Sequence, residues 1–367
     1  MFKMDRYNRH IILSEIGHKG QEKLSKSKVL VAGAGGLGCP VLQYLAAAGI
    51  GTLGIIDYDI VELTNLQRQI LFGTSSIGKN KANEAKAKLQ DLNQTINIIA
   101  YPEQLTFQNA IELFGQFDII VDGTDNFETR YLINDACVIT NKPLVFGAIY
   151  KFQGQVAVFN FNNGPSYRCA FPAKPKKGEV PNCSQVGVLG VLPGIIGTMM
   201  ANEVLKIVLG IGNILSGEMR CYDALSNQNH IIKINRNEAE IESIILNKND
   251  FQNQKMNNIC SSEDIEVSIE AFLNKQNVQF IDVRELHEQP KIKNFNVIEI
   301  PLSVLENQLD LISRVEEKAI FCQSGIRSKT AVSILKKYHI NNCYSIKEGA
   351  SEIIGYINKS NKNVIHE

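Results

Sequence analysis

The sequence predicts an α/β protein with two domains, the larger one built on a Rossmann-like, mostly parallel sheet. Residues 28–160 alternate short apolar runs with helical patterns, which is typical of a parallel sheet covered by helices on both faces. A glycine-rich turn, Gly33 to Gly38, follows the first apolar run, as in nucleotide-binding folds of this class. A second, smaller set of strand-like and helical patterns follows a polar stretch near residue 250.

The first strand-like run, residues 29–32, leads into G-A-G-G-L-G and then into a helical pattern over residues 41–48. A second apolar run, residues 52–56, ends at Asp57, 24 positions after Gly33. Glycines let the backbone approach phosphate, the helix N-terminus offers N–H donors, and an acid after the second strand can reach a ribose hydroxyl. The pattern predicts a nucleotide site that includes Gly33, Gly35, Gly36, Gly38 and Asp57.

The segment after Asp57 carries polar residues that a dehydrogenase does not usually need. It reads Asp57-Tyr-Asp59-Ile-Val-Glu62-Leu-Thr-Asn65-Leu-Gln67-Arg68-Gln69, and Lys81 follows. Arg68 and Lys81 can neutralise a triphosphate. We expect Asp59 and Gln69, with Asn126 further along the chain, to orient this loop, and Asn65 to belong to the same nucleotide site.

A third apolar run, residues 117–121, ends in Asp122-Gly-Thr-Asp125-Asn126. Asp125, at the carboxyl end of a strand, can hold Mg²⁺ beside the phosphates. Polyphosphate with a metal indicates group transfer from ATP, whereas hydride transfer needs no such cation. An NAD-dependent dehydrogenase remains an alternative, and it would bind NAD(H) without needing Mg²⁺.

Later elements complete the predicted domain plan. Residues 167–185 read as a long loop, 198–209 as a helix and 218–234 as two further strands. A stretch poor in apolar residues predicts a linker. A smaller α/β domain with strand-like runs and a helix follows. The predicted limits are 1–245 for the first domain, 246–263 for the linker and 264–367 for the second domain.

Bulk properties exclude several classes of partner. Lys plus Arg and Asp plus Glu both number 38, so zero net charge gives no indication of nucleic acid or an acidic membrane as partner. The N-terminus lacks the apolar core of a signal peptide, and the apolar stretch at residues 186–201 is too short and too interrupted to span a bilayer. Eight cysteines without regular spacing are typical of reduced thiols. We therefore expect a cytoplasmic protein.

Several separated motifs, taken in order, resemble the MoeB/ThiF family, relatives of the ubiquitin-activating enzymes. They are Arg6-Tyr-Asn-Arg9, the glycine loop, Asp57-x-Asp59, Asn65-Leu-Gln-Arg68-Gln69, Lys81, Thr124-Asp125-Asn126 and Gly187-Val-Leu-Gly190. The resemblance covers roughly residues 5 to 235. It implies ATP and Mg²⁺ as cofactors, and a homodimer in which Arg9 reaches the neighbouring subunit's ATP. A surface charge on an N-terminal helix is the simpler alternative for Arg9.

A second chemical centre lies at Cys322-Gln-Ser-Gly-Ile-Arg327, between a predicted strand and a helix. A thiol there faces backbone N–H groups and a helix N-terminus, which favour the thiolate. With Asp282-Val-Arg284-Glu285 upstream, the segment resembles a rhodanese domain, whose loop cysteine carries sulfur as a persulfide. Only four residues separate Cys322 from Arg327, which favours sulfur over phosphate. A non-catalytic docking module remains an alternative.

Two other cysteines occupy positions that matter in the resembled family. Cys183 precedes the Gly187 run, where several members form covalent links with the carrier or its sulfur donor; an incidental thiol is the alternative. Cys169 corresponds to one ligand of a zinc site in many relatives, but Ser166 replaces another and the downstream pair is missing. Tetrahedral zinc needs four ligands, so we expect no structural zinc.

The resemblances together predict an adenylyltransferase fused to a sulfurtransferase. Its implied substrate is a small ubiquitin-like sulfur carrier ending in Gly-Gly, of the ThiS or MoaD kind, whose C-terminal glycine is adenylated and converted to a thiocarboxylate. The sulfur would come from a cysteine desulfurase or thiosulfate, and the pathway would be molybdopterin, thiamine, cysteine or another. An enzyme that adenylates a peptide or tRNA is an alternative.

Overall fold

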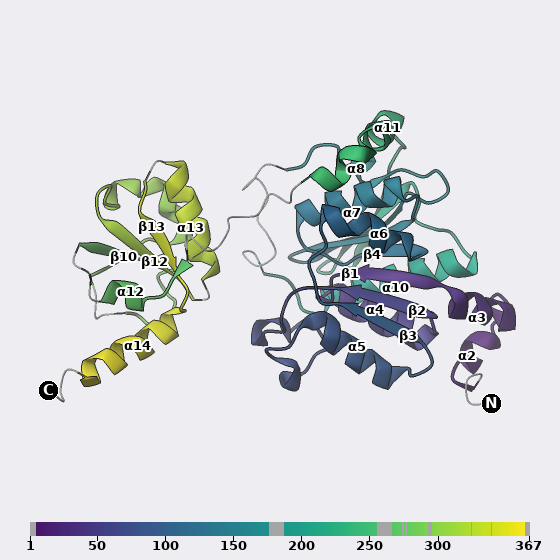
Figure 1. Ribbon diagram of the computed structural model, residues 1–367, viewed down its shortest axis with the longest axis horizontal. Coiled ribbons are helices and arrows are strands. Elements are labelled where there is room, and N and C mark those ends of the chain that lie inside the picture. Colours follow the sequence, from purple (N-terminus) through teal and green to yellow (C-terminus); the bar gives the residue numbers. More distant parts are fainter. Residues whose placement is uncertain are drawn as a thin grey trace. The chain divides into compact units, whose positions relative to one another are not determined.

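The computed structural model describes residues 5–175, 187–254 and 266–363, apart from residues 274, 276, 293–295, 324 and 339. The chain divides into two compact units, Met1–Met256 and Asn257–Glu367 (Figure 1). The predicted limits at residues 245 and 264 stay predictions. Part of the expected linker is structured instead: residues 248–253 form a short 3-10 helix, and Phe251 packs on Phe107 with ring centroids 5.0 Å apart.

The first unit is built on one eight-stranded sheet of order β3-β2-β1-β4-β5-β6-β7-β8. Strands β3 to β5 pair in parallel and β5 to β8 pair antiparallel, so the predicted mostly parallel sheet is confirmed. The strands are β1 (Lys28–Ala32), β2 (Thr52–Ile56), β3 (Asn97–Tyr101), β4 (Ile119–Asp122), β5 (Leu144–Tyr150), β6 (Gln153–Phe159), β7 (Glu218–Asp223) and β8 (Gln228–Lys233).

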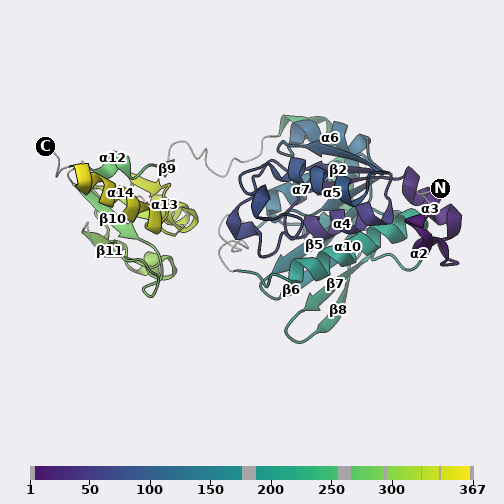
Figure 2. The same cartoon turned by 90° about the horizontal axis from the view of Figure 1, so that it is seen from below.

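Helices cover both faces of this sheet (Figures 1 and 2). One face carries α3 (Gly17–Lys26), α4 (Gly38–Ala48), α5 (Lys81–Leu92) and α10 (Leu192–Leu209), and the other carries α6 (Phe107–Gly115) and α7 (Phe127–Ile139). The short helices are α2 (Asn8–Ile11), η1 (Leu63–Asn65), η2 (Thr74–Ser76), α8 (Tyr167–Ala170), α11 (Glu238–Leu246) and η3 (Lys248–Asn253).

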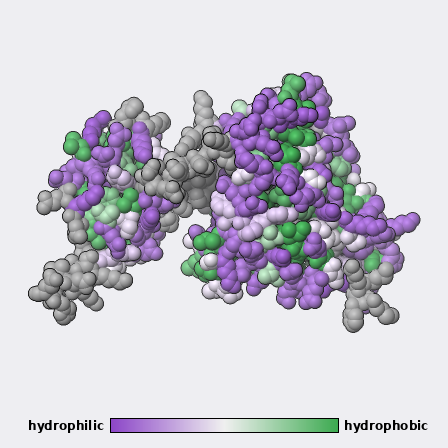
Figure 3. Space-filling model, in the orientation of Figure 1, coloured by the Kyte–Doolittle hydropathy of each residue, from purple (hydrophilic) through white to green (hydrophobic). Residues whose placement is uncertain are grey.

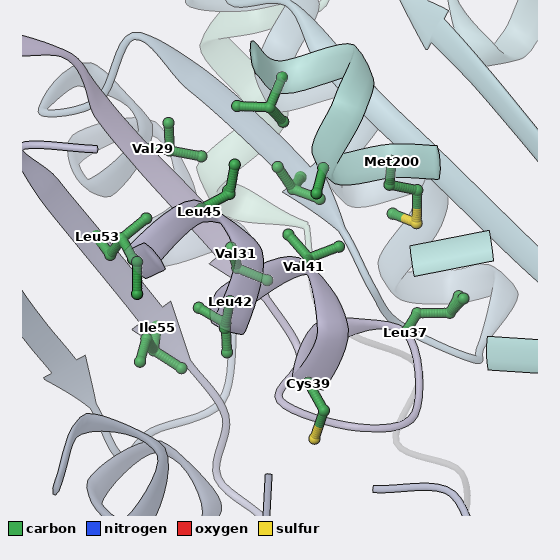
Figure 4. Packing of buried hydrophobic residues seen from close by; sticks show 14 of the residues in the cluster. Val29, Val31, Leu37, Cys39, Val41, Leu42, Leu45, Leu53, Ile55 and Met200 are labelled. Atoms are coloured by element: carbon green, nitrogen blue, oxygen red, sulfur yellow. The ribbon is translucent and has the colours of Figure 1, made fainter. Parts of the chain in front are cut away.

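Alternation along β1 explains why the sheet has a core on each face. Val29 and Val31 point to the α4 side, where they pack with Leu42 and Leu45 (Figure 4). Leu30 and Ala32 point to the other side. Successive side chains in a strand face opposite ways, so a strand buried on both faces is a continuous apolar run.

Helix α10 is long and apolar enough to cross a membrane by length and composition, but half of it is buried within the protein. It packs on α4, β5 and β6. Glycines allow this close packing: a Cβ on Gly147 would lie 2.2 Å from the Met200 sulfur, and one on Gly197 would lie 2.4 Å from Pro40. Core packing therefore accounts for the apolar stretch. The helix begins at Leu192, earlier than the predicted residue 198.

The second unit contains a five-stranded parallel sheet of order β11-β10-β12-β13-β9. Its strands are β9 (Glu266–Val267), β10 (Val278–Asp282), β11 (Val297–Glu299), β12 (Glu317–Phe321) and β13 (Cys343–Ile346). Its helices are α12 (Glu270–Leu273), η5 (Leu302–Asn307), η6 (Leu309–Leu311), α13 (Ile326–Lys337) and α14 (Ala350–Asn363). Separate apolar clusters line the two faces of the sheet. The predicted smaller α/β domain is thus confirmed as a fold class.

Candidate active sites

The strand order places three predicted site segments at one edge of the first sheet. Strand β1 lies between β2 and β4; the glycine loop follows β1, Asp57 follows β2, and the turn with Asp125 follows β4. Ligands of open α/β sheets bind at the carboxyl ends of the strands, where the strand order reverses. The sequence-predicted nucleotide residues therefore lie at the carboxyl edge of this sheet, called the crevice, after the ligand site of such sheets.

Two glycines of the loop are required by its geometry. Gly33 has φ of 92°, and a Cβ there would lie 3.0 Å from the Gly123 oxygen. A Cβ on Gly38 would lie 1.9 Å from the Gly33 oxygen. The loop thus folds back on itself and on the turn after β4, and α4 begins directly behind it. Gly35 and Gly36 lie beside the segment that carries Arg68 and Gln69. A Cβ on Gly35 would lie 3.8 Å from Gln69 Nε2, and one on Gly36 would lie 3.6 Å from Arg68 Cγ.

Asp57 fixes the glycine loop. Its carboxylate accepts the Ala34 N–H at 2.7 Å and the Asp59 N–H at 2.9 Å. Burial raises the pKa of Asp57, and the nearby Lys81 ammonium acts in the opposite direction. Lys81 is itself buried and donates to Asp59 at 2.9 Å.

The residue before α5 hydrogen-bonds to the backbone of Asp57 and Asp59. The Asn80 amide donates to the backbone oxygens of Asp57 and Asp59, while its side-chain oxygen accepts the Asn83 N–H and caps the helix. One side chain thus ties the helix that begins with Lys81 to the ends of the Asp57 segment.

In the Asn65–Gln69 turn, two side chains are buried and a third, Arg68, lies against the glycine loop. Asn65 is buried and accepts the Glu62 N–H, which stabilises the turn. Gln69 is also buried, and its Oε1 atom has no hydrogen-bond partner among the residues that the structure describes. Arg68 donates to the Thr64 oxygen at 3.1 Å and lies against Gly36. Arg68 therefore borders the glycine loop, as its predicted phosphate role requires.

The turn after β4 carries the predicted metal-binding residue. Asp125 is exposed, and Asn126 caps α7 by accepting the Thr129 N–H. Asp122 accepts both the N–H and the hydroxyl of Thr124, and Arg130 donates to the Thr124 oxygen at 3.1 Å. Arg130 therefore supports this turn. Burial raises the pKa of Asp122.

The described residues include no group of three or more His, Cys, Asp or Glu that could hold a metal by itself. Mg²⁺ usually keeps several waters and binds through one or two carboxylates and substrate phosphates. A single exposed Asp125 beside the glycine loop fits a metal that arrives with ATP.

The predicted Gly187–Gly190 run also borders the crevice. A Cβ on Gly190 would lie 2.4 Å from Gln67 Oε1, and the Leu189 N–H donates to the Lys151 oxygen. Pro193, at the start of α10, packs on Gly36. Cys183, four positions before Gly187 in the sequence, lies outside the described residues.

Arg9 lies far from the crevice of its own chain. Its neighbour Tyr7 packs on Gly49, just after α4, and accepts from Asn93, just after α5. Arg6 donates to the Leu92 oxygen at the end of α5. Helices α4 and α5 begin at the crevice and end here, and each is about 16–18 Å long. Arg9 is therefore at the opposite edge of the sheet.

The second predicted centre, Cys322, directly follows β12 and is 0% exposed. Its sulfur lies 3.6 Å from the Ser328 hydroxyl, and the Ala350 N–H donates to its backbone oxygen. Gly325, with φ of 76°, is the N-cap residue directly before α13. The cysteine thus sits between a strand and a helix N-terminus, as predicted.

Two ion pairs flank the Cys322 loop. Arg327 donates to both carboxylate oxygens of Glu288, the Nη2–Oε2 distance being 2.8 Å. This pairing lowers the pKa of Glu288 to about 2. Arg284, almost fully buried, pairs with Asp282 and also donates to the Gln323 side chain at 3.2 Å.

Cys169 makes hydrogen bonds in place of a metal ligand set. Its sulfur accepts the N–H groups of Ser166 and Asn237, both at 3.3 Å, which joins the start of α8 to the turn before α11. The expected lack of structural zinc stays a prediction. Among the other cysteines, Cys39 is buried in the core, and burial raises the pKa of its thiol to about 12.

Comparison with known proteins identifies the family. The ThiF family model matches residues 7–243. The chain belongs to the ThiF family.

Relatives of this ThiF-family protein extend the comparison to both units. It is 50% identical over 240 residues to the sulfur carrier protein adenylyltransferase of Thermus thermophilus, covering 64% of this chain and 89% of that one. It is 39% identical over 353 residues to the adenylyltransferase and sulfurtransferase MOCS3 of Culex quinquefasciatus, covering 89% of this chain and 81% of the relative. The predicted class, an adenylyltransferase with sulfurtransferase activity, is confirmed, and the dehydrogenase alternative is set aside.

A solved structure supports the fold of the first unit. Escherichia coli MccB with ATP matches with a TM-score of 0.54 and 24% identity, covering 63% of this chain and 71% of MccB.

Sequence reasoning missed several residues of this ThiF-family protein that hold the sites together. Asn80 could have been found, because Asn directly before a helix is a capping signal. Glu288 could not, since its contact with Arg327 joins positions 39 residues apart.

Proposed function

We propose that this protein adenylates the C-terminal glycine of a small ubiquitin-like sulfur carrier ending in Gly-Gly and then transfers sulfur to it. The observation that carries the proposal is the convergence of the glycine loop, Lys81 and Asp125 on one crevice, in a family whose relatives are named for these two activities. We further propose that it works in the cytoplasm.

ATP fits this crevice in a specific orientation. Asp57 would bind ribose with the lone pairs that its bonds to Ala34 and Asp59 leave free. Loop N–H groups at the start of α4, with Arg68 and Lys81, would neutralise the phosphates. Lys81 would exchange its bond with Asp59 for one with phosphate. Asp125 would hold Mg²⁺, which supplies charge neutralisation when bound.

Adenylation makes the carrier's carboxylate reactive. A carboxylate oxygen attacks the α-phosphorus of ATP, the bond to the β-phosphate oxygen breaks, and pyrophosphate leaves with the electron pair. The residues of this chain orient the two anions and offset their repulsion. The product is an acyl-adenylate with AMP as a leaving group.

Sulfur transfer then involves Cys322. Its persulfide, loaded from a cysteine desulfurase or thiosulfate, attacks the acyl carbon and expels AMP, which gives an acyl disulfide. Attack of the Cys183 thiolate on the Cys322 sulfur forms an enzyme disulfide and releases the thiocarboxylate, and a cellular thiol later reduces that disulfide. Cys183 is suited by sequence, since it lies four residues before the Gly187–Gly190 run, in which Gly190 lies against Gln67 and Leu189 bonds to Lys151.

A homodimer completes the site. Arg9 is exposed and lies at the far edge of its own sheet, so its predicted phosphate role requires a second subunit. Exposed apolar residues at the carboxyl edge of β5 and at the hairpins beyond it offer a surface for the carrier. They are Tyr150, Phe152 and Leu225.

Carrier-dependent exchange between pyrophosphate and ATP tests the adenylation step. Asp125→Ala should reduce exchange at least a hundredfold, because it removes the carboxylate that would hold Mg²⁺, and with it the neutralisation of phosphate charge. Asp91→Ala, which changes an exposed acid on α5, is the matched control and should exchange normally. Normal exchange by Asp125→Ala would show that the crevice is misassigned.

A further inference from the structure

A chain of three buried polar side chains runs through the core of the second unit. The Ser345 hydroxyl lies 2.8 Å from the Ser328 hydroxyl, which lies 3.6 Å from the Cys322 sulfur. All three residues are 0% exposed and come from β13, α13 and the end of β12. Burying hydroxyl groups is unfavourable unless they are hydrogen-bonded. The two serine hydroxyls satisfy each other, and the Ser328 hydroxyl also reaches the sulfur.

The Ser328 hydroxyl can either accept from Cys322 or donate to it. It now donates to the Gly325 oxygen at 2.9 Å, which leaves its two lone pairs for Ser345 and for a Cys322 thiol proton. When Cys322 is a thiolate, rotation of the Ser328 O–H points its proton at the sulfur. Among the described residues, Ser328 is the one hydrogen-bond partner of the Cys322 sulfur.

The charged groups near the loop are already paired. Arg327 on α13 is held by Glu288, Arg284 by Asp282, and Lys329 by Glu266. Arg327 lies close enough to interact electrostatically with the Cys322 sulfur, but its hydrogen bonds go to Glu288. Besides the N-terminus of α13, the neutral Ser328 hydroxyl in direct contact is therefore the group placed to stabilise negative charge on the buried sulfur.

We propose that Ser328 is a catalytic residue for sulfur loading, donating to the Cys322 thiolate, and that Ser345 is its positioning residue. The inference rests on the proposed sulfur transfer. In loading from thiosulfate, the Cys322 proton goes to solvent and the thiolate attacks the outer sulfur. The S–S bond of thiosulfate breaks, sulfite leaves with the electron pair, and Cys322 gains one sulfur atom.

The test is single-turnover loading of the full-length protein with thiosulfate, followed by the mass of the Cys322 peptide. Ser328→Ala should load about tenfold more slowly near pH 7, the loss expected for one hydrogen bond to a charged group. The deficit should be smaller at pH 9 than at pH 7, because a higher pH favours the thiolate form of any thiol and makes loading depend less on that bond. Ser345→Ala should show a smaller deficit with the same pH trend, since Ser328 keeps its contact with sulfur.

Controls separate this role from a structural one. Ser333→Ala removes a hydroxyl on the same helix that bonds the Lys329 oxygen, and it should load normally. A wild-type loading rate in Ser328→Ala, or equal slowing at both pH values, would overturn the proposal. If Ser328→Ala fails to fold, Ser345→Ala decides, because it leaves the bond to Gly325 intact. If the wild type loads Cys322 from neither thiosulfate nor a cysteine desulfurase while pyrophosphate exchange proceeds, sulfur transfer fails as a function, and the serine proposal with it.

Discussion

The ion pair between Arg327 and Glu288 stabilises the loop of Cys322. Their contact is bidentate and only partly exposed, which makes it stronger than an isolated surface pair. Glu288→Gln should lower the unfolding free energy of the second unit by about 1.5–3 kcal/mol, the range for hydrogen bonds to charged groups. Hydrogen exchange of peptides from β10, β12 and α13 in the full chain measures this. Glu317→Gln, which breaks the more exposed Lys275–Glu317 pair, is the control and should change little.

The same pair gives a pH dependence with a defined sign. Because pairing lowers the pKa of Glu288 from 4.5 to about 2, its contribution is present above pH 4.5 and is lost as pH falls toward 2. The stability difference between wild type and Glu288→Gln should therefore vanish over that interval. A difference that persisted at pH 2 would contradict the assignment.

At the scale of elements, the start of α5 links helix capping to nucleotide binding. Asn80→Ala removes a cap worth about 1 kcal/mol and also frees the ends of the Asp57–Asp59 segment. We expect the KM for ATP to rise several-fold in the exchange assay. Asn237→Ala removes the equivalent cap of α11, away from the crevice, and should leave this KM unchanged. Equal KM values in both variants would show that Asn80 serves only its helix.

The elements also show what sequence could predict. The glycine loop, the ends of β1, β2 and β4, and the placement of Cys322 follow from local patterns, because turns and apolar runs have local causes. The 3-10 helix at residues 248–253 was not predictable, since its stability comes from Phe251 packing on a distant helix. The Ser345–Ser328–Cys322 chain was also hidden, because parallel strands bring together residues far apart in sequence.

At the scale of the whole molecule, the position of α2 makes the dimer testable. Mixing Arg9→Ala subunits with Asp125→Ala subunits should restore about a quarter of wild-type exchange, since half of randomly formed dimers are hybrids with one intact site. Each variant alone should be nearly inactive. If hybrids form and no activity returns, Arg9 has no role across the interface.

The two units should separate by mutation into adenylation and sulfur transfer. Cys322→Ala should abolish thiocarboxylate formation and leave pyrophosphate exchange nearly unchanged, because no thiol takes part in attack on the α-phosphate. Intact-mass spectrometry of the carrier measures the product. Normal thiocarboxylate yield from Cys322→Ala would mean that the second unit is a docking module.

Cys183 then decides how the product leaves. Cys183→Ala should also keep exchange, but thiocarboxylate release should slow while an acyl-disulfide adduct between carrier and Cys322 accumulates. The adduct is expected because the acyl disulfide breaks only when a thiolate attacks one of its sulfurs. Intact masses of stalled reactions, with and without an added small-molecule thiol, test this. An added thiol should clear the adduct in place of Cys183. Normal turnover with no adduct would make Cys183 an incidental thiol and leave release to a free reductant or another cysteine.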